Sequence, residues 1–321
     1  MLETLSAPFV LPLVTLLLGL IVGSFLNVVV HRLPRMLSRE WRSQALDVIG
    51  EWAQEGDAPA AVRRSVDALG DVRQKLRDAP RFDLVAPRSA CPRCGTKITA
   101  LHNIPVVSWL WLRGHCGGCG AAISKRYPVV EGITGLLSGY IAWRFGFSVA
   151  TAAALLFCWA MIAATFIDLD TMYLPDDITL PLLWLGLLVN LAAAAAPDLF
   201  FPLHIQSPLP LPGRLDYAVV GAAAGYLSLW SVYWIFKLAT GKEGMGFGDF
   251  KLLAATGAWF GWVSLLPVVL ISSMVGALIG ISLILLREHA REKPIPFGPY
   301  LAAAGLIYMF FGRQLAAYVF G

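Results

Sequence analysis

Charged residues are scarce in this chain. Asp, Glu, Lys and Arg make up 14% of its 321 residues, whereas hydrophobic residues make up 57%, and the mean hydropathy is +0.67. So little charge cannot cover the surface of a soluble protein of this length, and so much apolar content excludes a disordered chain. Five cysteines are too few for a disulfide-rich secreted module. The composition therefore predicts a membrane protein.

Apolar runs of roughly 18 to 25 residues, the length of a membrane-spanning helix, recur along the sequence. The first run lies in residues 1–30 and lacks the basic start of a cleaved signal peptide, so it is predicted to be a transmembrane helix. Seven more spans are predicted within residues 128–321, with Gly261 and Pro267 as the break between the sixth and seventh. Their ranges are 128–146, 150–167, 179–197, 217–238, 251–266, 268–286 and 297–316.

Residues 31–127 form a polar insert between the first and second spans. The insert holds 16 of the 25 Lys and Arg residues and 9 of the 21 Asp and Glu residues. Because basic segments beside spans stay in the cytoplasm, the insert is predicted to be cytoplasmic and both chain ends external. Residues 36–83 show apolar positions at helical spacing among charges, which predicts amphipathic helices. Its basic surface suits anionic lipid headgroups, and no nucleic-acid partner is predicted.

The second part of the insert, residues 88–127, contains four of the five cysteines. Two Cys-x-x-Cys pairs, Cys91 with Cys94 and Cys116 with Cys119, are separated by 21 residues. Four thiolates in this spacing are typical of a closed, structural zinc site. A thioredoxin-like redox pair is the alternative, although it needs only one of the two motifs. The predicted fold is an all-α polytopic membrane protein of about eight transmembrane helices with a cytoplasmic zinc-ribbon-like insert.

Two aspartates are predicted at the same membrane face. Asp168 ends the third span and Asp249 precedes the sixth, so both fall at the cytoplasmic side. Ionisable residues at membrane depth usually face a bundle interior and serve function. Two carboxylates held close share one proton, so one can activate a water while the other polarises a carbonyl, as in aspartyl proteases. Asp168 and Asp249 are therefore the predicted catalytic pair.

Residues around Asp249 are predicted to support it. Gly246 and Gly248 allow the backbone to approach a bound peptide closely. Lys251 is typical of a lysine that snorkels to the membrane surface, and the alternative is that it tunes the charge of Asp249. An aspartate at a span end often simply caps a helix, which is the plain alternative for each acid taken alone. A second alternative takes Asp168 and Asp170 as the metal-chelating pair of a lipid-linked glycosyltransferase. A third makes the chain a non-enzymatic, zinc-stapled assembly scaffold.

The chain resembles the bacterial prepilin peptidases, which belong to the membrane-embedded Gly-x-Gly-Asp class of aspartic peptidases. The resemblance covers nearly the whole chain, although residues 39–83 look longer than the usual insert. The motifs that carry it are Gly23-Ser24-Phe25-Leu26-Asn27-Val28, His31-Arg32-Leu33-Pro34, the two cysteine pairs, Ile167-Asp168 with Leu174-Pro175-Asp176, Gly246-Phe247-Gly248-Asp249 with Lys251, and Pro296-Phe297-Gly298-Pro299.

This resemblance implies a bifunctional enzyme of the bacterial inner membrane in type IV pilus and type II secretion systems. It implies that the enzyme removes the leader of prepilins and pseudopilins at the cytoplasmic face with Asp168 and Asp249 as catalytic residues. It further implies methylation of the new N-terminal amine with S-adenosylmethionine as donor. The glycines from Gly244 to Gly248 lie in a short loop before a membrane helix, which does not fit a dinucleotide-binding fingerprint. The sequence therefore predicts no donor-binding residues.

Overall fold

A computed structural model describes residues 9–99, 101–200, 210–211, 213–286 and 295–320, and within them every regular element is a helix. Two isolated antiparallel bridges, Ala90 with Lys97 and His115 with Ala122, are the extended pairings in this part of the chain. The predicted all-α class is confirmed. The helices are α2 Val10–Trp52, α3 Ala60–Ala68, α4 Gly70–Arg77, η1 Leu101–Asn103, α5 Val107–Trp111, α6 Arg126–Phe145, α7 Val149–Thr171, α8 Asp176–Ala195, α9 Pro197–Phe200, α10 Leu215–Thr240, α11 Phe247–Phe260, η2 Trp262–Ser264, α12 Leu265–Leu285 and α13 Gly298–Phe320.

All eight predicted spans overlap helices, namely α2, α6, α7, α8, α10, α11, α12 and α13. By length and composition, six of the described helices are suited to span a membrane. The other two helices that overlap predicted spans, α6 and α11, are not among these six. α6 includes Arg126, Glu131 and Arg144, and α11 has only 14 residues. The predicted break falls at Gly261, whose φ of 76° ends α11, whereas Pro267 lies in the first turn of α12, where proline is tolerated.

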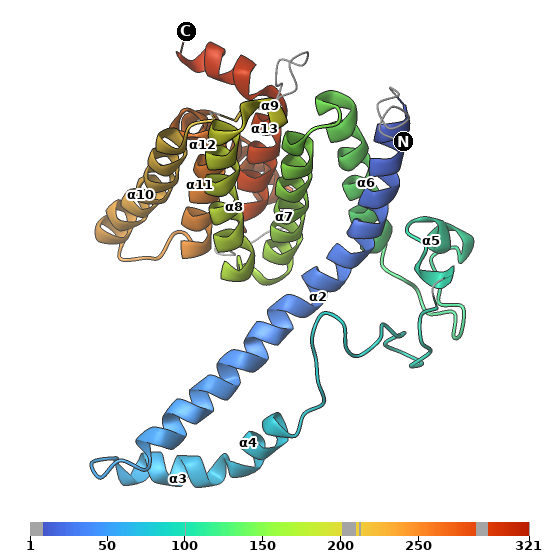
Figure 1. Cartoon of the computed structure of the whole chain (residues 1–321). Coiled ribbons are helices and arrows are strands. Elements are labelled where there is room, and N and C mark those ends of the chain that lie inside the picture. The colour runs from blue at the N-terminus through green and yellow to red at the C-terminus, as the bar shows by residue number, and fades with distance from the viewer. Residues whose placement is uncertain (1–8, 100, 201–209, 212, 287–294, 321) are drawn as a thin grey trace.

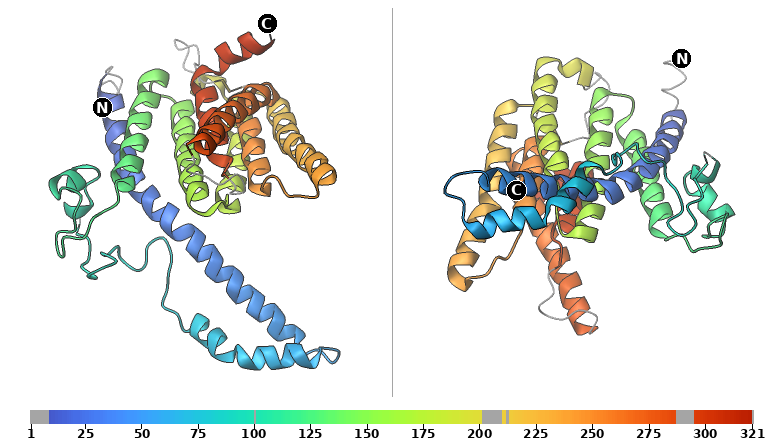
Figure 2. Two further views of the ribbon diagram at one scale, coloured as in Figure 1. Left: turned by 180° about the vertical axis from the view of Figure 1, so that it is seen from behind. Right: turned by 90° about the horizontal axis from the view of Figure 1, so that it is seen from below.

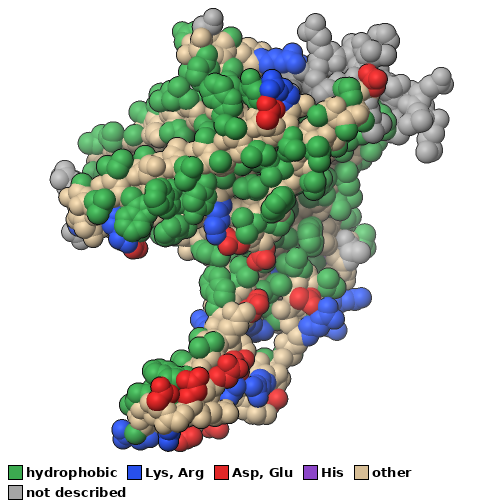
Figure 3. Space-filling view, turned by 60° about the vertical axis from the view of Figure 1, so that its left-hand side comes forward, with side chains coloured by type: hydrophobic (Ala, Val, Ile, Leu, Met, Phe, Trp, Pro, Cys, Tyr) green, Lys and Arg blue, Asp and Glu red, His purple; other side chains and the backbone are tan. Residues whose placement is uncertain are grey.

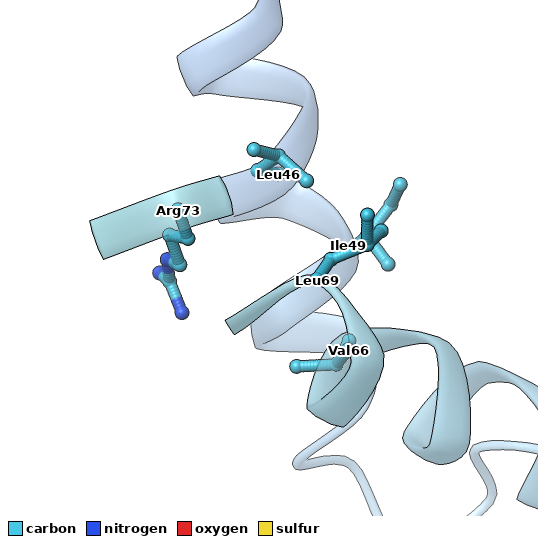
Figure 4. A pocket seen from close by; sticks show the side chains of 5 residues that line it. All are labelled: Leu46, Ile49, Val66, Leu69 and Arg73. Carbon is cyan, nitrogen blue, oxygen red and sulfur yellow. The ribbon is translucent and has the colours of Figure 1, made fainter. Parts of the chain in front are cut away.

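The first helix is one continuous element of 43 residues that runs through the predicted division at residue 30. Pro34 lies inside it, but the change from apolar to polar composition alone does not end a helix. Residues 31–52 of α2, together with α3 and α4, form an extension that we call the arm (Figure 1). The arm has a small apolar pocket where α2 meets α3 and α4 (Figure 4), lined by Leu46, Ile49, Val66, Leu69 and Arg73.

The arm passes beneath the helix bundle, as the view from below in Figure 2 shows. Trp41 of the arm packs edge-on against Tyr173 in the loop between α7 and α8, with ring centroids 5.2 Å apart. The arm also contacts the part of the insert that follows α4. The buried Arg32 donates hydrogen bonds to the carbonyl oxygens of Asp83, at 2.8 Å, and Pro87, at 2.6 Å. In Figure 3 hydrophobic side chains cover the bundle, whereas charged side chains gather on the arm.

The bundle core surrounds α11, which packs against α8, α10 and α13. Nearly every residue of α11 is buried, including Trp259, whose indole N–H donates to the Leu182 carbonyl at 2.8 Å. α10 and α11 approach closely because glycines face each other: a Cβ built on Gly221 would lie 2.3 Å from the Gly257 carbonyl oxygen. Such small-residue contacts are typical of membrane helix packing.

Five helices bring one of their ends to a common face of the bundle. Arg126 at the start of α6 pairs with Asp170 near the end of α7, and Lys251 in the first turns of α11 pairs with Asp176 at the start of α8. The start of α13 meets the end of α7 through a hydrogen bond from Gly298. This face points towards the arm, and the outer ends of α2 and α13 lie on the opposite side (Figure 1). The arrangement agrees with helices that alternate in direction across a membrane.

Candidate active site and metal centre

Asp168 lies in the last turn of α7 and is only 4% exposed. α7 ends after Thr171 because Met172 adopts a left-handed conformation with φ of 53° and donates its N–H to the Asp168 carbonyl at 2.8 Å. The carboxylate Oδ2 of Asp168 accepts the backbone N–H of Gly298 at 3.0 Å. Gly298 is the first residue of α13, so Asp168 occupies the N-terminus of that helix, where free N–H groups favour an acidic partner.

Asp249 is the third residue of α11 and is 7% exposed. α11 begins after Gly246, whose extended backbone precedes the helix, and the Asp249 N–H donates to the Gly246 carbonyl at 3.3 Å. A Cβ at Gly246 would lie 4.0 Å from Asp249 Oδ2, so the carboxylate turns back towards the loop of glycines. Asp168 is close enough to Asp249 for the two carboxylates to interact electrostatically.

Leu174 connects the surroundings of the two aspartates. A Cβ on Gly248, the residue before Asp249, would lie 2.6 Å from Leu174 Cβ. A Cβ on Gly298, which binds Asp168, would lie 3.0 Å from Leu174 Cδ1. The buried Leu174 therefore sits against both backbone segments that hold the acids. Both acids, from helices distant in sequence, are thus buried next to backbone segments that contact the same leucine.

Lys251 has a different partner from the predicted one. Its ammonium lies 2.6 Å and 2.7 Å from the two carboxylate oxygens of Asp176, at the start of α8. Both side chains are partly exposed, at 26% and 49%. The ion pair ties the beginning of α11 to the beginning of α8, so Lys251 fixes the helix that carries Asp249. Sequence reasoning missed Asp176 as its partner.

Asp170 does not join the pair of buried acids. It lies two residues after Asp168, on another side of α7, and forms an ion pair with Arg126. Arg126 also donates to the Phe166 carbonyl at 2.8 Å and lies over the Phe166 ring. Within the described residues, the group with metal-binding geometry consists of cysteines and contains neither Asp168 nor Asp170. The arrangement therefore does not support the glycosyltransferase alternative.

The four predicted cysteine ligands come together in the insert. The sulfur atoms of Cys91, Cys94, Cys116 and Cys119 all lie within 4.8 Å of one another, so they could hold a metal ion. Cys91 and Cys119 Sγ are 3.8 Å apart, and Cys94 and Cys116 Sγ are 3.9 Å apart. Tetrahedral zinc with bonds of about 2.3 Å requires sulfur atoms about 3.8 Å apart. The cluster therefore has the dimensions of a tetrahedral thiolate site.

The two cysteine motifs fold as equivalent turns. After each one, Gly95 and Gly120 adopt φ of 71° and 68°. Their N–H groups donate to the carbonyl oxygens of Cys91, at 2.9 Å, and Cys116, at 2.8 Å. The Thr96 hydroxyl, 3.1 Å from Cys94 Sγ, lowers the pKa of Cys94 to about 6. A thiolate is therefore available at neutral pH, which is the form that binds metal.

Two family models match successive parts of the chain. The Bacterial Peptidase A24 N-terminal domain matches residues 17–145, which hold α6, the insert and most of α2. The Type IV leader peptidase family matches residues 155–281, which include Asp168 and Asp249. Proteins named prepilin leader peptidase/N-methyltransferase are similar over almost their whole length. The chain belongs to the type IV leader peptidase family.

Three of these relatives show the extent of the similarity. The Aeromonas salmonicida protein is 52% identical over 299 residues, 93% of this chain and 90% of its own. The Pseudomonas aeruginosa protein is 48% identical over 310 residues, 97% and 93% of the two chains. The Burkholderia pseudomallei protein is 43% identical over 297 residues, 92% and 84%. No solved structure matches this member of the family.

Gly298 is the site residue that sequence reasoning did not assign a role. Its motif, Phe297-Gly298-Pro299, contributes to the family resemblance, but the sequence gives it no role in the site. The structure shows why glycine stands there, since a Cβ would lie 2.6 Å from Asp168 Oδ2. A glycine followed by proline at a helix start is a usable signal, because it predicts a tight helix entry with an available N–H.

Proposed function

We propose that this protein removes the leader of prepilins at the cytoplasmic face of the bacterial inner membrane and methylates the N-terminal amine that cleavage exposes. The family and the names of its relatives support both activities. The observation that supports the peptidase most directly is the enclosed pair of Asp168 and Asp249 at the ends of α7 and α11. Pseudopilins of type II secretion systems are proposed as further substrates.

In the proposed cleavage step, Asp168 and Asp249 hold one proton between them. The charged carboxylate removes a proton from a water molecule, which attacks the carbonyl carbon of the scissile bond, while the protonated carboxyl donates a hydrogen bond to the carbonyl oxygen. A proton then passes to the leaving nitrogen as the peptide bond breaks. Gly246, where an added Cβ would meet only Asp249 Oδ2 at 4.0 Å, leaves room for an extended peptide beside Asp249, whereas Gly248 is packed against Leu174. The new amine is the group that S-adenosylmethionine methylates.

We also propose that the four cysteines bind one structural zinc ion. The thiolate spacing supports a closed tetrahedral site, which leaves no position for substrate. The role of the metal would then be to fold residues 88–127, with the catalytic chemistry left to the aspartates. The basic insert and the common face of helix ends next to the arm support a cytoplasmic position for the insert and the catalytic pair.

The test uses purified full-length protein in detergent or nanodiscs, a prepilin, and S-adenosylmethionine with a labelled methyl group. Mass spectrometry reads loss of the leader and methylation of the amine separately. Asp168→Asn and Asp249→Asn should each lower cleavage by about 10²- to 10⁴-fold, whereas the matched control Asp170→Asn should retain it. Equal loss in Asp170→Asn would instead favour a metal-chelating Asp168 and Asp170 pair. A chelator is a poorer test, because it can also strip metal from the cysteines.

A further inference from the structure

The short helix α5, Val107–Trp111, exposes its apolar face and buries a polar residue, the opposite of a helix on a soluble domain. Val107, Leu110 and Trp111 lie at helical positions i, i+3 and i+4 and are 56%, 62% and 71% exposed. Ser108 is buried, and its hydroxyl donates to the Leu101 carbonyl at 2.6 Å. Leu101 itself is 64% exposed. We call Leu101, Val107, Leu110 and Trp111 the α5 patch. Such a patch predicts an apolar surrounding.

The depth of the patch follows from its attachment to α6. The Val106 N–H, directly before α5, donates to Glu131 Oε2 at 2.7 Å. Glu131 is buried and lies five residues after Arg126, where α6 begins. At a rise of 1.5 Å per residue, this anchor is about 7 Å along α6 from its start. Interfacial helices lie about 5–10 Å into the boundary between headgroups and acyl chains. With the start of α6 at the membrane surface, as the sequence predicts, α5 would lie at interfacial depth, and it is placed beside the lower part of α6 (Figure 1).

This attachment is fixed in position. Val106 has φ of 59°, which is unfavourable for a β-branched residue, and the hydrogen bond to Glu131 supports that conformation. Glu131 in turn packs tightly on α2, because a Cβ on Gly23 would lie 2.7 Å from Glu131 Cα. On its other side, α5 is bound by the Trp109 indole, which donates to the Ile123 carbonyl at 3.2 Å. The patch thus projects from a rigid support on two predicted membrane helices.

The surroundings of the patch match a lipid interface in chemistry. The same helix pair already presents an apolar outer surface, with Leu17 and Ile21 of α2 at 52% and 62% exposed. Tryptophan is enriched at membrane interfaces, as Trp111 would be here. Arg113, two residues after the end of α5, and Lys125, directly before α6, are exposed cations suited to anionic headgroups.

We propose that the α5 patch inserts into the cytoplasmic leaflet of the bilayer and anchors the cysteine insert to the membrane surface. The second cysteine turn follows α5 directly, and the Gly114 N–H donates to the Trp109 carbonyl at 2.9 Å. Lipid contact at α5 therefore holds the metal-binding turns close to the membrane. The proposal rests on the proposed membrane position of α2 and α6 and is independent of peptidase activity.

The experiment places the photoreactive residue p-benzoylphenylalanine at one position of the full chain, reconstituted in vesicles of phosphatidylethanolamine and phosphatidylglycerol. The test site is Leu110. Leu17 on α2 is the positive control, and Val48, an equally exposed apolar residue of the arm, is the matched negative control. After irradiation, mass spectrometry should find lipid adducts at positions 17 and 110 and none at 48. Adducts at 17 without adducts at 110, or adducts at 110 to a second copy of the chain or another protein, would overturn the proposal.

A second variant tests the apolar contact itself. With the photoreactive residue at Val107, Leu110→Asp should lower the yield of lipid adducts about tenfold, because it replaces a side chain that gains free energy from leaving water with one that loses it. Val48→Asp in the same background should leave the yield unchanged. An unchanged yield in Leu110→Asp would reject the anchor. Leader cleavage is measured on the same samples, so a failure of the proposed function is recognised separately from a failure of lipid contact.

Discussion

The position of Asp168 depends on the absence of a side chain at residue 298. Asp168 Oδ2 accepts the Gly298 N–H at 3.0 Å, and a Cβ at residue 298 would lie 2.6 Å from the same oxygen. Gly298→Ala should therefore displace the carboxylate from the helix N-terminus and lower kcat for leader cleavage by about 10- to 100-fold, since small displacements of a catalytic group have effects of this size. Steady-state assays with a prepilin substrate measure the change.

Gly132→Ala is the matched control for this substitution. Gly132 lies on α6, and a Cβ there meets no atom within 4 Å. The control should retain wild-type cleavage and stability. If Gly298→Ala also retains wild-type kcat, the contact between α13 and Asp168 has no part in catalysis.

Asp168 and Asp249 should behave as one catalytic unit. Each single substitution by Asn should lower kcat by about 10²- to 10⁴-fold, the range of general acid and base catalysis. The kcat of the double variant should be no lower than that of the less active single variant. The reason is that the two carboxylates can no longer share a proton once either of them is replaced. Losses that multiply in the double variant would show that the two acids act independently.

Sequence reasoning could identify the two aspartates because each is a rare charge at the end of an apolar run. It could not identify Gly298, because the Asp168 contact spans 130 residues and depends on where α13 enters the bundle. It also assigned Lys251 to Asp249 from proximity along the chain. The orientation of α11 instead turns Lys251 towards Asp176 on α8.

Among the elements, α11 depends most on close contact with a neighbour. A Cβ on Gly221 of α10 would lie 2.3 Å from the Gly257 carbonyl oxygen of α11. Gly221→Ala should therefore separate the two helices and destabilise the protein by about 1–3 kcal/mol, as overpacking in a core does. Thermal unfolding of the detergent-purified protein measures the loss. Gly280→Ala on α12 is the control, because its nearest contact would be an ordinary 3.6 Å.

The ends of α11 also show what the sequence could not provide. The apolar run predicts a span at 251–266. The helix is instead Phe247–Phe260, because it begins directly after the extended Gly246, takes in the buried Asp249, and pairs Lys251 with Asp176. Only Gly261, with its positive φ, was a local signal strong enough to place a boundary.

The ion pair of Lys251 and Asp176 should contribute little to stability by itself. Both side chains are partly exposed, so solvent screens the attraction and removing either charge should cost about 0–1 kcal/mol. Lys251→Glu should cost more, because it faces like charge at Asp176. The double exchange Lys251→Asp with Asp176→Lys should recover the lost melting temperature. A double variant as unstable as the single one would mean that the charges at residues 251 and 176 do not interact.

For the whole molecule, the composition correctly predicted an apolar bundle and a polar insert. It could not show that α2 continues unbroken from the bundle into the arm, because a change in polarity does not terminate a helix, and α2 also continues through Pro34. The division of the chain at residues 30 and 127 stays a prediction. The packing of α2 on α6, through Gly19 and Gly23 against Ser138 and Glu131, joins the segments on both sides of the insert.

The insert and the bundle should respond differently to loss of metal. Residues around the cysteine turns are largely exposed, and Cys94 and Cys119 are themselves exposed, so few buried apolar side chains hold this segment together. The bundle has its own core, with Phe157, Phe250 and Trp259 fully buried. A metal ion that supplies the folding free energy of the turns should therefore be needed by the insert and not by the bundle.

Wild-type protein should contain about one zinc ion per chain, and Cys94→Ser should lower that content. The variant should become sensitive to limited proteolysis within residues 88–127, while the segment from α7 to α13 stays resistant. Cys158→Ala is the control, because Cys158 is buried in α7, far in sequence from the cluster, and its loss should leave the metal in place. Absence of metal from the wild type, or proteolysis spread equally over the bundle, would contradict a structural metal confined to the insert.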